Sequence, residues 1–370
     1  MAETPGLILV VNAGSSSCKL RLLGPDDAVL ERADLPAIEG AEAELVAGAI
    51  AGWPAPVAVG HRVVHGGTRF VAPVVLDTAT IAAIDALSPL APLHQPRSVA
   101  AISAVRAALS ELPHVAAFDT AFHATLPDAA STYAIPAAWR ELGVRRYGFH
   151  GLSHGYASRR AAVLCGREHD PSFRVVTCHL GAGASLAAVH GGRSVDTTMG
   201  FTPLEGLVMA TRSGSIDPGI VTWLVTDHGM PAADVTDALE HRSGLAGLAG
   251  TDDMRVVLER SAAGDGEARL ALDVYIHWLR ASIAAMVASL GGIDALVFTG
   301  GVGERSAPVR ALATEGLGFL GVALDGPAND SATGAEDGEV SAAGAAVRAF
   351  VVPAREEVEI AGQVRQVLGG

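Results

Sequence analysis

Residues 7–23 read LILVVNAGSSSCKLRLL, two apolar runs separated by a turn of small and polar residues. Apolar runs bounded by a turn of this kind are typical of a β-hairpin. Residues 175–189, VVTCHLGAGASLAAV, repeat the arrangement, and residues 295–304, ALVFTGGVGE, form a buried strand that enters a glycine turn ahead of a helix. Backbone N–H groups in such turns can bind phosphate or ribose. The likeness of the two hairpins predicts two similar units.

Lys19 closes the turn of the first hairpin and is the one lysine in the chain, which otherwise carries 25 arginines. An ammonium is a compact point charge that suits a phosphate oxygen, whereas a guanidinium is a planar fork. We therefore interpret Lys19 as a phosphate contact. The alternative is a lysine left at this position by chance.

Length and charge restrict the class of protein. A chain of 370 residues is long enough for two domains. Its net charge of −14 argues against a nucleic-acid surface, which needs clustered Lys and Arg. The most apolar helical stretch, 270–290, is broken by Asp273, His277 and Arg280, which favours a buried core helix over a membrane span.

The cysteines and the N-terminus predict a cytoplasmic protein. Cys18, Cys165 and Cys178 are odd in number and lack the paired spacing of a zinc or redox site, so we expect reduced thiols. The first residues contain neither a basic region nor a small-residue cleavage site.

Helical periodicity alternates with the strands and predicts an α/β fold, in which helices cover mixed sheets. The boundary between the two halves is expected near residues 148–151, and the Asp-, Gly- and Ala-rich tract 325–344 is expected to be a surface excursion. The predicted helices span residues 77–88, 97–111, 153–165, 217–229, 267–290 and 355–368.

Two arginines are candidates for binding an anion. In GHRVVHGG, residues 60–67, strand alternation places Arg62 on the same face as Val64, so Arg62 should be half-buried with an anionic partner. Arg212 lies in a loop before an Asp-Pro helix start, where charged groups often serve a ligand. A structural salt bridge is the alternative for Arg62.

Asp119 and His150 are candidates for catalysis. Asp119 follows an apolar run, so its carboxylate should emerge at the end of a strand, where it could orient a nucleophile, hold a metal or cap a turn. His150 stands between glycines that leave room for a ligand. His150 and His154 are four residues apart, as are His61 and His65, but no third ligand follows at a recognisable spacing for a transition metal.

Glu356 and Asn12 are candidates for a magnesium site. Glu356 and Glu357 begin the last helix, where a carboxylate complements the helix N-terminus. Asn12 could accept a metal-bound water through its amide oxygen. Capping of the helix and of the turn remains the alternative for both.

Taken together, these segments resemble the acetate kinase (acetokinase) family, within the wider fold of acetate and sugar kinases, heat-shock ATPases and actin. Ten blocks occur in the family order and cover nearly the whole chain. They are VNAGSSSCKL, GHRVVHGG, APLH, FDTAFH, YGFHGLSH, CHLGAGAS, MGFTPLEG, TRSGSIDPG, FTGGVGE and PAREE.

The resemblance implies two duplicated actin/ribonuclease-H-like domains with a cleft between them, in a homodimer that needs neither nucleic acid nor membrane. Residues 1–149 would form the first domain, completed by the C-terminal helix 354–370, and residues 150–353 the nucleotide-binding domain. The implied reaction is reversible phosphoryl transfer from Mg-ATP (or Mn-ATP) to acetate, giving acetyl phosphate and ADP. A carboxylate is already a nucleophile, so this chemistry needs mainly two anions held in line and their charge neutralised.

The resemblance also assigns roles to individual residues. Arg62 would bind the acid, Arg212 and His150 would stabilise the transition state, and Asp119 would be the catalytic carboxylate. Asn12 and Glu356 resemble the magnesium positions. The apolar pocket for the acetate methyl would consist of Val64, Leu93, Phe149 and Pro203, and Val64 favours acetate over longer acids. The nucleotide contacts would be Lys19, His179, Leu180, Gly181, Ala182, Gly183, Asp253, Met254, Arg255, Gly301, Val302, Gly303, Glu304 and Arg305.

Three departures from the family pattern concern the phosphoryl donor. Ala182 replaces an asparagine in the phosphate turn, Arg305 replaces an asparagine at the end of GGxGEN, and the stretch between Lys19 and Arg62 is shortened. They leave open a pyrophosphate donor beside ATP. A propionate or longer-chain carboxylate kinase also stays open, as does, from a different class, a non-catalytic ATP-binding protein related to actin and chaperone ATPases.

Overall fold

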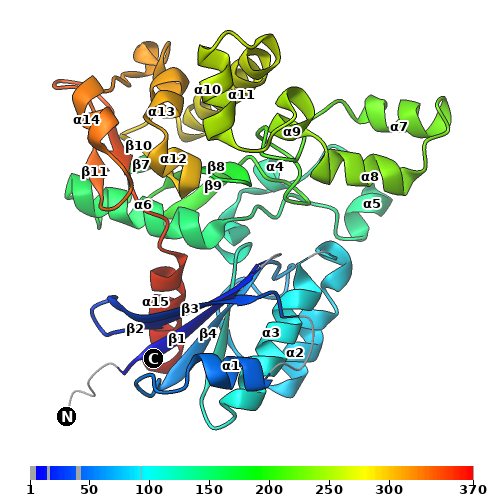
Figure 1. Cartoon of the computed structure of the whole chain (residues 1–370), viewed down its shortest axis with the longest axis vertical. Helices are drawn as coiled ribbons and strands as arrows, with labels where there is room; N and C mark the ends of the chain where they lie inside the picture. Colours follow the sequence, from blue (N-terminus) through cyan, green and yellow to red (C-terminus); the bar gives the residue numbers. More distant parts are fainter. Residues whose placement is uncertain (1–5, 15–16, 39–42, 93, 370) are drawn as a thin grey trace. The chain divides into compact units, whose positions relative to one another are not determined.

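The computed structural model describes residues 6–14, 17–38, 43–92 and 94–369. The chain forms two compact units (Figure 1). The first comprises residues up to Ala124, Phe149–Tyr156 and the segment from Arg355 onward; the second comprises Thr125–Gly148 and Ala157–Ala354. Residues 125–148, which the sequence analysis placed in the first domain, therefore cluster with the second.

The first unit is built on a six-stranded mixed sheet. The hairpin predicted at residues 7–23 is confirmed, because β1 and β2 pair antiparallel with Asn12 opposite Lys19. Strands β1, β4 and β6 run parallel at the centre, so the carboxyl ends of three strands meet at one edge. The order is β3 (Val29–Pro36), β2 (Ser17–Leu23), β1 (Ile8–Ala13), β4 (Ala58–Val63), β6 (His114–Phe118) and β5 (Val74–Val75).

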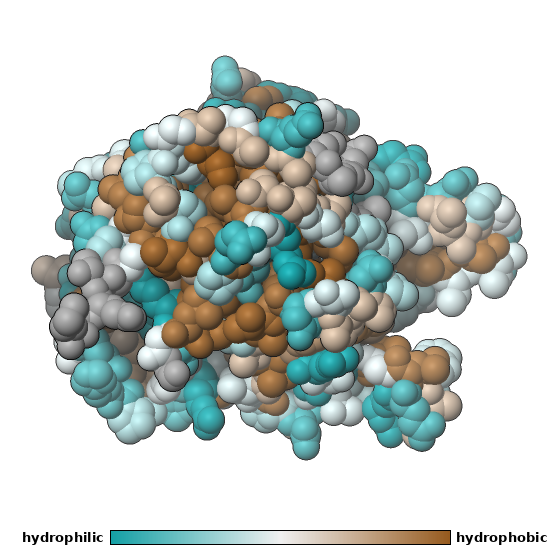
Figure 2. Space-filling model, turned by 90° about the horizontal axis from the view of Figure 1, so that it is seen from below, coloured by the Kyte–Doolittle hydropathy of each residue, from teal (hydrophilic) through white to brown (hydrophobic). Residues whose placement is uncertain are grey.

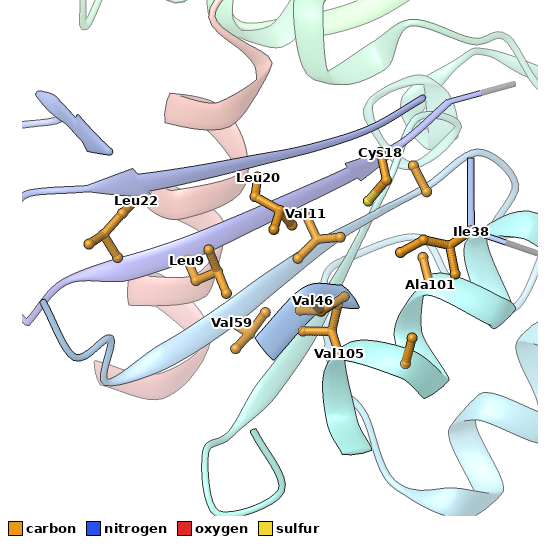
Figure 3. Close-up of a cluster of buried hydrophobic side chains, with 12 residues drawn as sticks. Leu9, Val11, Cys18, Leu20, Leu22, Ile38, Val46, Val59, Ala101 and Val105 are labelled. Carbon is orange, nitrogen blue, oxygen red and sulfur yellow. The ribbon is translucent and has the colours of Figure 1, made fainter. Parts of the chain in front are cut away.

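Helices cover both faces of this sheet, because its strands alternate apolar side chains between two cores. Leu9 and Val11 face α1 (Ala43–Ala49) and α3 (Gln95–Ala108), as Figure 3 shows. Ile8 and Val10 face α15 (Glu356–Gly369) on the opposite side. The helix α2 (Thr78–Asp85) packs against α3, and the 3₁₀ turn Ser88–Leu90 follows α2 in the chain.

The second unit repeats the topology of the first. Its order is β9 (Arg193–Thr197), β8 (Ala184–His190), β7 (Arg174–Leu180), β10 (Ala295–Thr299), β12 (Arg348–Val351) and β11 (Gly338–Glu339). Position by position, the pairs are antiparallel, antiparallel, parallel, parallel and antiparallel, as in the first sheet. The predicted pair of similar α/β units with mixed sheets is confirmed.

Among the described residues, one helix, α11 (Gly266–Leu290), has the length and apolar composition to cross a membrane. It packs against β8 and β9, and ten of its residues are buried. Its role in the second unit is therefore that of a core helix, as the interruptions by Asp273, His277 and Arg280 predicted.

The remaining helices of the second unit surround its sheet (Figure 1). They are α4 (Asp128–Ser131), α5 (Ala137–Glu141), most of α6 (Gly151–Cys165), α7 (Pro218–Thr226), α8 (Ala232–His241), α9 (Gly244–Ala249), α10 (Met254–Ala262), α12 (Gly300–Arg305), α13 (Ala307–Thr314), the 3₁₀ turn Gly318–Leu320 and α14 (Gly326–Ser331). The six helices predicted by residue range are found, and α13 is the helix expected after the glycine turn of residues 300–304. The helices α4, α5, α8, α9, α10 and α14 were not predicted.

The tract 325–344 is more ordered than the sequence suggested. It contains α14 and the edge strand β11, which pairs with β12. Most of its residues are exposed or half-buried, so the expected position at the surface is confirmed, and Asp and Gly residues here cap a short helix and form turns between regular elements. Asp325, for example, accepts from the Ala328 N–H as the cap of α14.

Apolar side chains also reach the surface. Figure 2 shows one face of the molecule, on which apolar areas alternate with polar ones. In the first unit Leu30, Val57 and Val71 are about half exposed, and in the second unit Trp139 and Trp223 are. Scattered exposed apolar residues of this kind are usual on protein surfaces.

Candidate active site

Arg62, at the end of β4, is the centre of a polar network in the first unit. Its Nε and Nη2 donate to both carboxylate oxygens of Asp119, with Nη2 2.6 Å from Oδ2 and Nε 3.1 Å from Oδ1. Its Nη1 donates to Asn12 Oδ1 at 3.1 Å. Asn12 Nδ2 in turn donates to Glu356 Oε2 at 3.0 Å, and that carboxylate lies 3.8 Å from Arg62 Nη1. The expected anionic partner of Arg62 is confirmed.

The network is a consequence of the fold. Asn12, Arg62 and Asp119 lie at or just beyond the carboxyl ends of β1, β4 and β6, three adjacent strands, and Glu356 begins α15, which covers them. Side chains from parallel strands meet at this edge of a sheet. Four stretches that are far apart in the sequence therefore contribute to one cluster.

Burial makes the charges of this cluster costly to separate. The Asp119 side chain is 1% exposed and that of Arg62 18%. Burial disfavours both charged forms, but Asp119 and Glu356 raise the pKa of Arg62, so the guanidinium stays charged. A bidentate pair of this kind fixes the plane of the guanidinium as well as its position.

His150 lies beside this network. The Gly151 N–H donates to the Asp119 carbonyl at 3.0 Å, and a Cβ at position 151 would approach that oxygen to 2.1 Å, so only glycine permits this contact. His150 has a φ of 56°, in the left-handed region that non-glycine residues rarely adopt. Such a conformation is typical of functional sites.

Two residues of the expected apolar pocket are buried in the core of the first unit. Val64 and Phe149 are buried, and the Phe149 ring contacts the His65 ring edge to face at 5.6 Å. Leu93 lies outside the described residues. The backbone carbonyl of Phe149 is 3.0 Å from His123 Nε2, which fixes its position.

The histidines of the first unit do not form a metal site in the part of the chain that the structure describes, where no three His, Cys, Asp or Glu side chains are suitably grouped. His61 Nε2 is instead 2.8 Å from His114 Nδ1, and His114 Nε2 is 3.0 Å from the Leu109 carbonyl. The transition-metal alternative is therefore not supported. β4 ends at Val63, so His65 lies beyond the expected strand alternation.

A cavity of about 690 Å³ opens in the second unit, at the turns after β7 and β10. Its size suits a nucleotide. Several predicted nucleotide contacts line it, namely Gly181, Ala182, Asp253, Met254, Arg255, Gly301, Val302 and Arg305. The wall also includes residues that the sequence analysis did not identify, among them Leu245, Leu258, Tyr275 and Ser306.

The rim of this cavity carries positively and negatively charged side chains. Arg255 pairs with Asp253 across 2.5 Å and its side chain is 90% exposed. Hydrogen bonds from Arg255 lower the pKa of Asp253 to about 2, so Asp253 remains ionised at neutral pH. Arg305 is exposed at the end of α12.

The remaining predicted nucleotide contacts lie elsewhere. His179 and Leu180 end β7, and Gly183 follows Ala182 in the turn, where its carbonyl accepts from the Gly181 N–H at 2.9 Å. Gly303 and Glu304 are buried on the inner side of α12. In the first unit, Lys19 lies within β2 rather than at the tip of the turn, and it is exposed.

Arg212 lies in a loop of the second unit with its guanidinium partly buried. Its Nη1 donates to the Pro203 carbonyl at 3.3 Å. Burial lowers the pKa of Arg212, while Glu240 opposes that shift. In the described ranges no carboxylate lies within ion-pair distance of Arg212, so a positive charge is held near Pro203 without a direct counter-ion.

A cluster that the sequence analysis missed holds this loop. Arg146 Nη2 donates to Glu205 Oε1 at 2.7 Å, and its Nη1 donates to the carbonyls of residues 197, 198 and 199 at 3.1–3.2 Å. The Tyr133 hydroxyl donates to the second Glu205 oxygen and accepts from the Phe201 N–H. The signal was present, since Glu205 lies in the MGFTPLEG block.

Comparison with known proteins gives a consistent picture. Residues 53–362 match the model of the acetokinase family. An acetate kinase of Deinococcus deserti is 47% identical, covering 98% of both chains. The crystal structure of a Porphyromonas gingivalis acetate kinase superposes with a TM-score of 0.90 at 35% identity, covering 98% of this chain and 99% of that one.

A propionate kinase from Francisella tularensis is nearly as similar in structure. It has a TM-score of 0.88 and 35% identity, and covers 96% of this chain and 98% of its own. The family match spans far more than half of the sequence, and the relatives align over almost their whole length. The chain therefore belongs to the acetokinase family.

Proposed function

We propose that this chain is an acetate kinase, a phosphotransferase that moves the γ-phosphoryl group of ATP reversibly to acetate. A carboxylate oxygen of acetate attacks the γ-phosphorus, the bond to the β-phosphate oxygen breaks, and acetyl phosphate and ADP are formed. No proton has to move, because the nucleophile is already an anion. The observation that carries the proposal is the network that fixes the Arg62 guanidinium beside Asn12 and Glu356.

Arg62 binds the acid in this proposal. Asp119 binds one edge of the guanidinium, and Nη1 on the other side is directed toward Asn12. At Nη1 the guanidinium can bind a second anion, the carboxylate of the acid. Asp119 acts on the reaction by orienting Arg62, since both of its oxygens already accept hydrogen bonds. Val64 and Phe149, with Leu93 and Pro203, would enclose the methyl group.

Arg212 and His150 stabilise the transition state. Phosphoryl transfer spreads negative charge over the equatorial oxygens, and an arginine directed at them can be worth roughly 10³–10⁵ in rate. Arg212 suits this role because it is partly buried near Pro203 and lacks a direct carboxylate partner in the described structure. His150 has a left-handed backbone and directly precedes Gly151, which donates to the Asp119 carbonyl.

The donor binds in the cavity of the second unit. Gly181, Ala182, Gly301 and Val302 provide backbone N–H groups in this cavity, while Asp253–Arg255 form the rim. In the first unit Lys19 supplies a phosphate contact. Ala182 and Arg305 stand where the family pattern has asparagines in the donor turns. Pyrophosphate should therefore be tested as a second donor.

Magnesium fits the oxygen atoms of the Arg62 network. Mg²⁺ prefers hard oxygen ligands and is usually held by one or two carboxylates together with phosphate oxygens and water. Glu356 provides such a carboxylate, and Asn12 an amide oxygen that could accept a metal-bound water. When bound, the ion would neutralise charge on the phosphates.

The proposal includes a cytoplasmic homodimer. Helix α7, all nine residues of which the structure describes, buries none of them although it carries Ile220, Trp223 and Leu224. A second copy of the chain could cover this surface, and light scattering would then give twice the 37.6 kDa chain mass. The three cysteines are free, as thiols are in a reducing compartment.

A hydroxylamine trap for acyl phosphates tests the proposal. Purified protein is incubated with ATP or pyrophosphate and with acetate, propionate or butyrate, with and without Mg²⁺. We expect hydroxamate from ATP and acetate, with kcat/KM falling along the acid series. One added methylene is worth about 1–3 kcal/mol, so discrimination against propionate should be incomplete.

Three results would change the assignment. A higher kcat/KM for propionate would favour the activity for which the Francisella tularensis relative is named. Nucleotide binding without hydroxamate for any acid would favour the non-catalytic alternative. Hydroxamate with pyrophosphate alone would identify that anion as the donor.

A further inference from the structure

Glu304 lies beneath the nucleotide cavity and is only 8% exposed. One of its carboxylate oxygens, Oε1, accepts two backbone hydrogen bonds. The Gly300 N–H donates to it at 2.9 Å, and the Ala354 N–H donates to the same atom at 2.8 Å. A single buried oxygen thus joins two segments of the second unit that are 50 residues or more apart in the sequence.

The first of these segments forms part of the cavity wall. Gly300 begins α12 with a φ of 76°, and a Cβ there would come within 2.8 Å of the Leu180 carbonyl. The backbone is therefore pressed against the end of β7. Gly301, Val302 and Arg305, which follow, line the cavity, whereas Glu304 is on the inner side.

The second segment is the point where the chain leaves this unit. Ala354 is the last residue of the second unit, and Arg355 begins the segment that belongs to the first. Two residues later, Glu356 starts α15 and accepts from Asn12 in the Arg62 network. Ala354 is therefore separated from α15 by Arg355 alone.

Arg310 fixes the opposite end of α12. It is fully buried, and its Nη1 donates to the carbonyls of Gly303 at 2.9 Å and Glu304 at 2.8 Å. Its Nε donates to Asn329 Oδ1 at 2.7 Å. The backbone of Glu304 is held by Arg310 while its side chain holds Gly300 and Ala354, so α12 cannot shift without breaking buried hydrogen bonds.

We propose that Glu304 is a positioning residue that ties the donor turn to the start of α15, rather than a contact of the nucleotide. The inference rests on the proposed function for the identity of the ligand. Its physical basis is that Oε1 is already used by two buried amides. The carboxylate thereby keeps the donor turn against the segment that ends at Ala354, two residues before α15 begins.

Three substitutions at this position separate the possible roles. Glu304→Gln keeps an oxygen at the Oε1 position without charge, Glu304→Asp keeps the charge but withdraws the oxygen by one methylene, and Glu304→Ala removes both. A positioning role predicts that Gln resembles the wild type and that Asp resembles Ala. A direct role toward phosphate-bound metal through charge predicts the reverse order.

Hydrogen exchange and kinetics provide the readouts. In the Asp and Ala variants we expect the amides of residues 300 and 354 to exchange about tenfold faster. We also expect KM for ATP to rise about tenfold, with KM for acetate within about twofold of wild type. Glu304→Gln should stay within about threefold of wild type in each measurement. Glu315→Ala, on a side chain that is 75% exposed after α13, is the matched control.

Exchange is measured without turnover, so the two proposals can fail separately. A wild-type protein without acyl phosphate formation would contradict the function but leave the exchange prediction in force. If the wild type is active, either of two results would overturn the positioning role. One is a Glu304→Asp variant as active as wild type, and the other is unchanged exchange of the residue 354 amide in Glu304→Ala. If Glu304→Ala does not fold, the comparison of Gln with Asp decides.

Discussion

At the scale of single residues, Arg62 is a positive charge that is oriented before any substrate binds. Replacing it by Ala leaves Asp119 buried without its partner, which typically costs about 3–5 kcal/mol of stability. We expect kcat/KM for acetate to fall by roughly 10³-fold or more. Urea unfolding and the hydroxamate assay, run on the same preparation, measure the two effects.

Arg21→Ala is the matched control for this experiment. Arg21 also pairs with an aspartate in the first sheet, at 2.7 Å, but Asp34 is 60% exposed. Exposed pairs of this kind contribute about 0–1 kcal/mol, so both stability and kcat/KM should stay near wild type. Equal losses in the two variants would mean that Arg62 acts only as a structural ion pair.

Lys19 tests whether the lone ammonium serves phosphate. A charged hydrogen bond contributes about 1.5–3 kcal/mol, so Lys19→Ala should raise KM for ATP by roughly 10- to 100-fold and leave KM for acetate unchanged. The KM for ATP of Lys19→Arg should lie between those of the wild type and Lys19→Ala. Arg32→Ala, an exposed cation on the adjacent strand β3, is the control. An unaltered KM for ATP in Lys19→Ala would show that the lysine is incidental.

Sequence reasoning found Arg62 and its need for an anion because an arginine beside valine in a strand must be compensated. It did not identify Asp119 as that anion, since the pairing of β4 with β6 is a long-range contact. Arg146 and Arg310 were missed for a related reason. Each donates hydrogen bonds to backbone carbonyls. Every residue has a carbonyl, so the sequence does not show which carbonyls an arginine will bind.

At the scale of elements, the loop with Pro203 and Arg212 depends on Arg146 and Glu205. Arg146→Lys keeps the charge opposite Glu205, but an ammonium cannot reach three carbonyls as the guanidinium does. We expect kcat/KM for acetate to fall about 100-fold, because small displacements of catalytic groups have effects of that size. The melting temperature should fall by only a few degrees.

Arg140→Lys is the control, because Arg140 lies in the same part of the chain, on the short helix α5, and is exposed. Wild-type kcat/KM in Arg146→Lys would show that the cluster is not needed to place Arg212. A parallel loss in both variants would point to a general change in the unit rather than to the loop.

Long elements with strong periodicity were predictable, whereas several of the short helices were not. The hairpins β1–β2 and β7–β8 and the long helices α3, α11 and α15 were found because alternation or apolar spacing persists over many residues. The helices α8 to α10 have between six and ten residues. Helices of that length depend on tertiary packing for their stability, which local sequence does not reveal.

At the scale of the whole molecule, the two units share one topology but differ in how they respond to acid. Burial lowers the pKa of His61, His65, His114 and His123, all in the first unit, and that of His65 and His123 to about 4. These side chains are neutral when folded, whereas the unfolded chain binds protons below about pH 6.5.

Stability should therefore be greatest above pH 6.5 and decline as the pH falls toward 4. His65 and His123 each contribute a loss of about 1.4 kcal/mol at pH 5.5, and His61 and His114 act in the same direction, so the first unit should lose more stability than the second. Urea titrations at pH 7.5 and 5.5, with hydrogen exchange to follow each unit, measure this. Equal stability at both values, or earlier loss of the second unit, would contradict it.

The central claim is that the phosphoryl group passes from nucleotide to carboxylate in one in-line step. The competing account is a phosphoenzyme, formed on Asp119, Glu356 or His150; attack by Asp119 would disrupt its buried pair with Arg62, which donates to both of its oxygens. The direct test uses ATP made chiral at the γ-phosphorus with three oxygen isotopes. Our account predicts inversion of configuration in acetyl phosphate; retention, which requires two displacements, would contradict it.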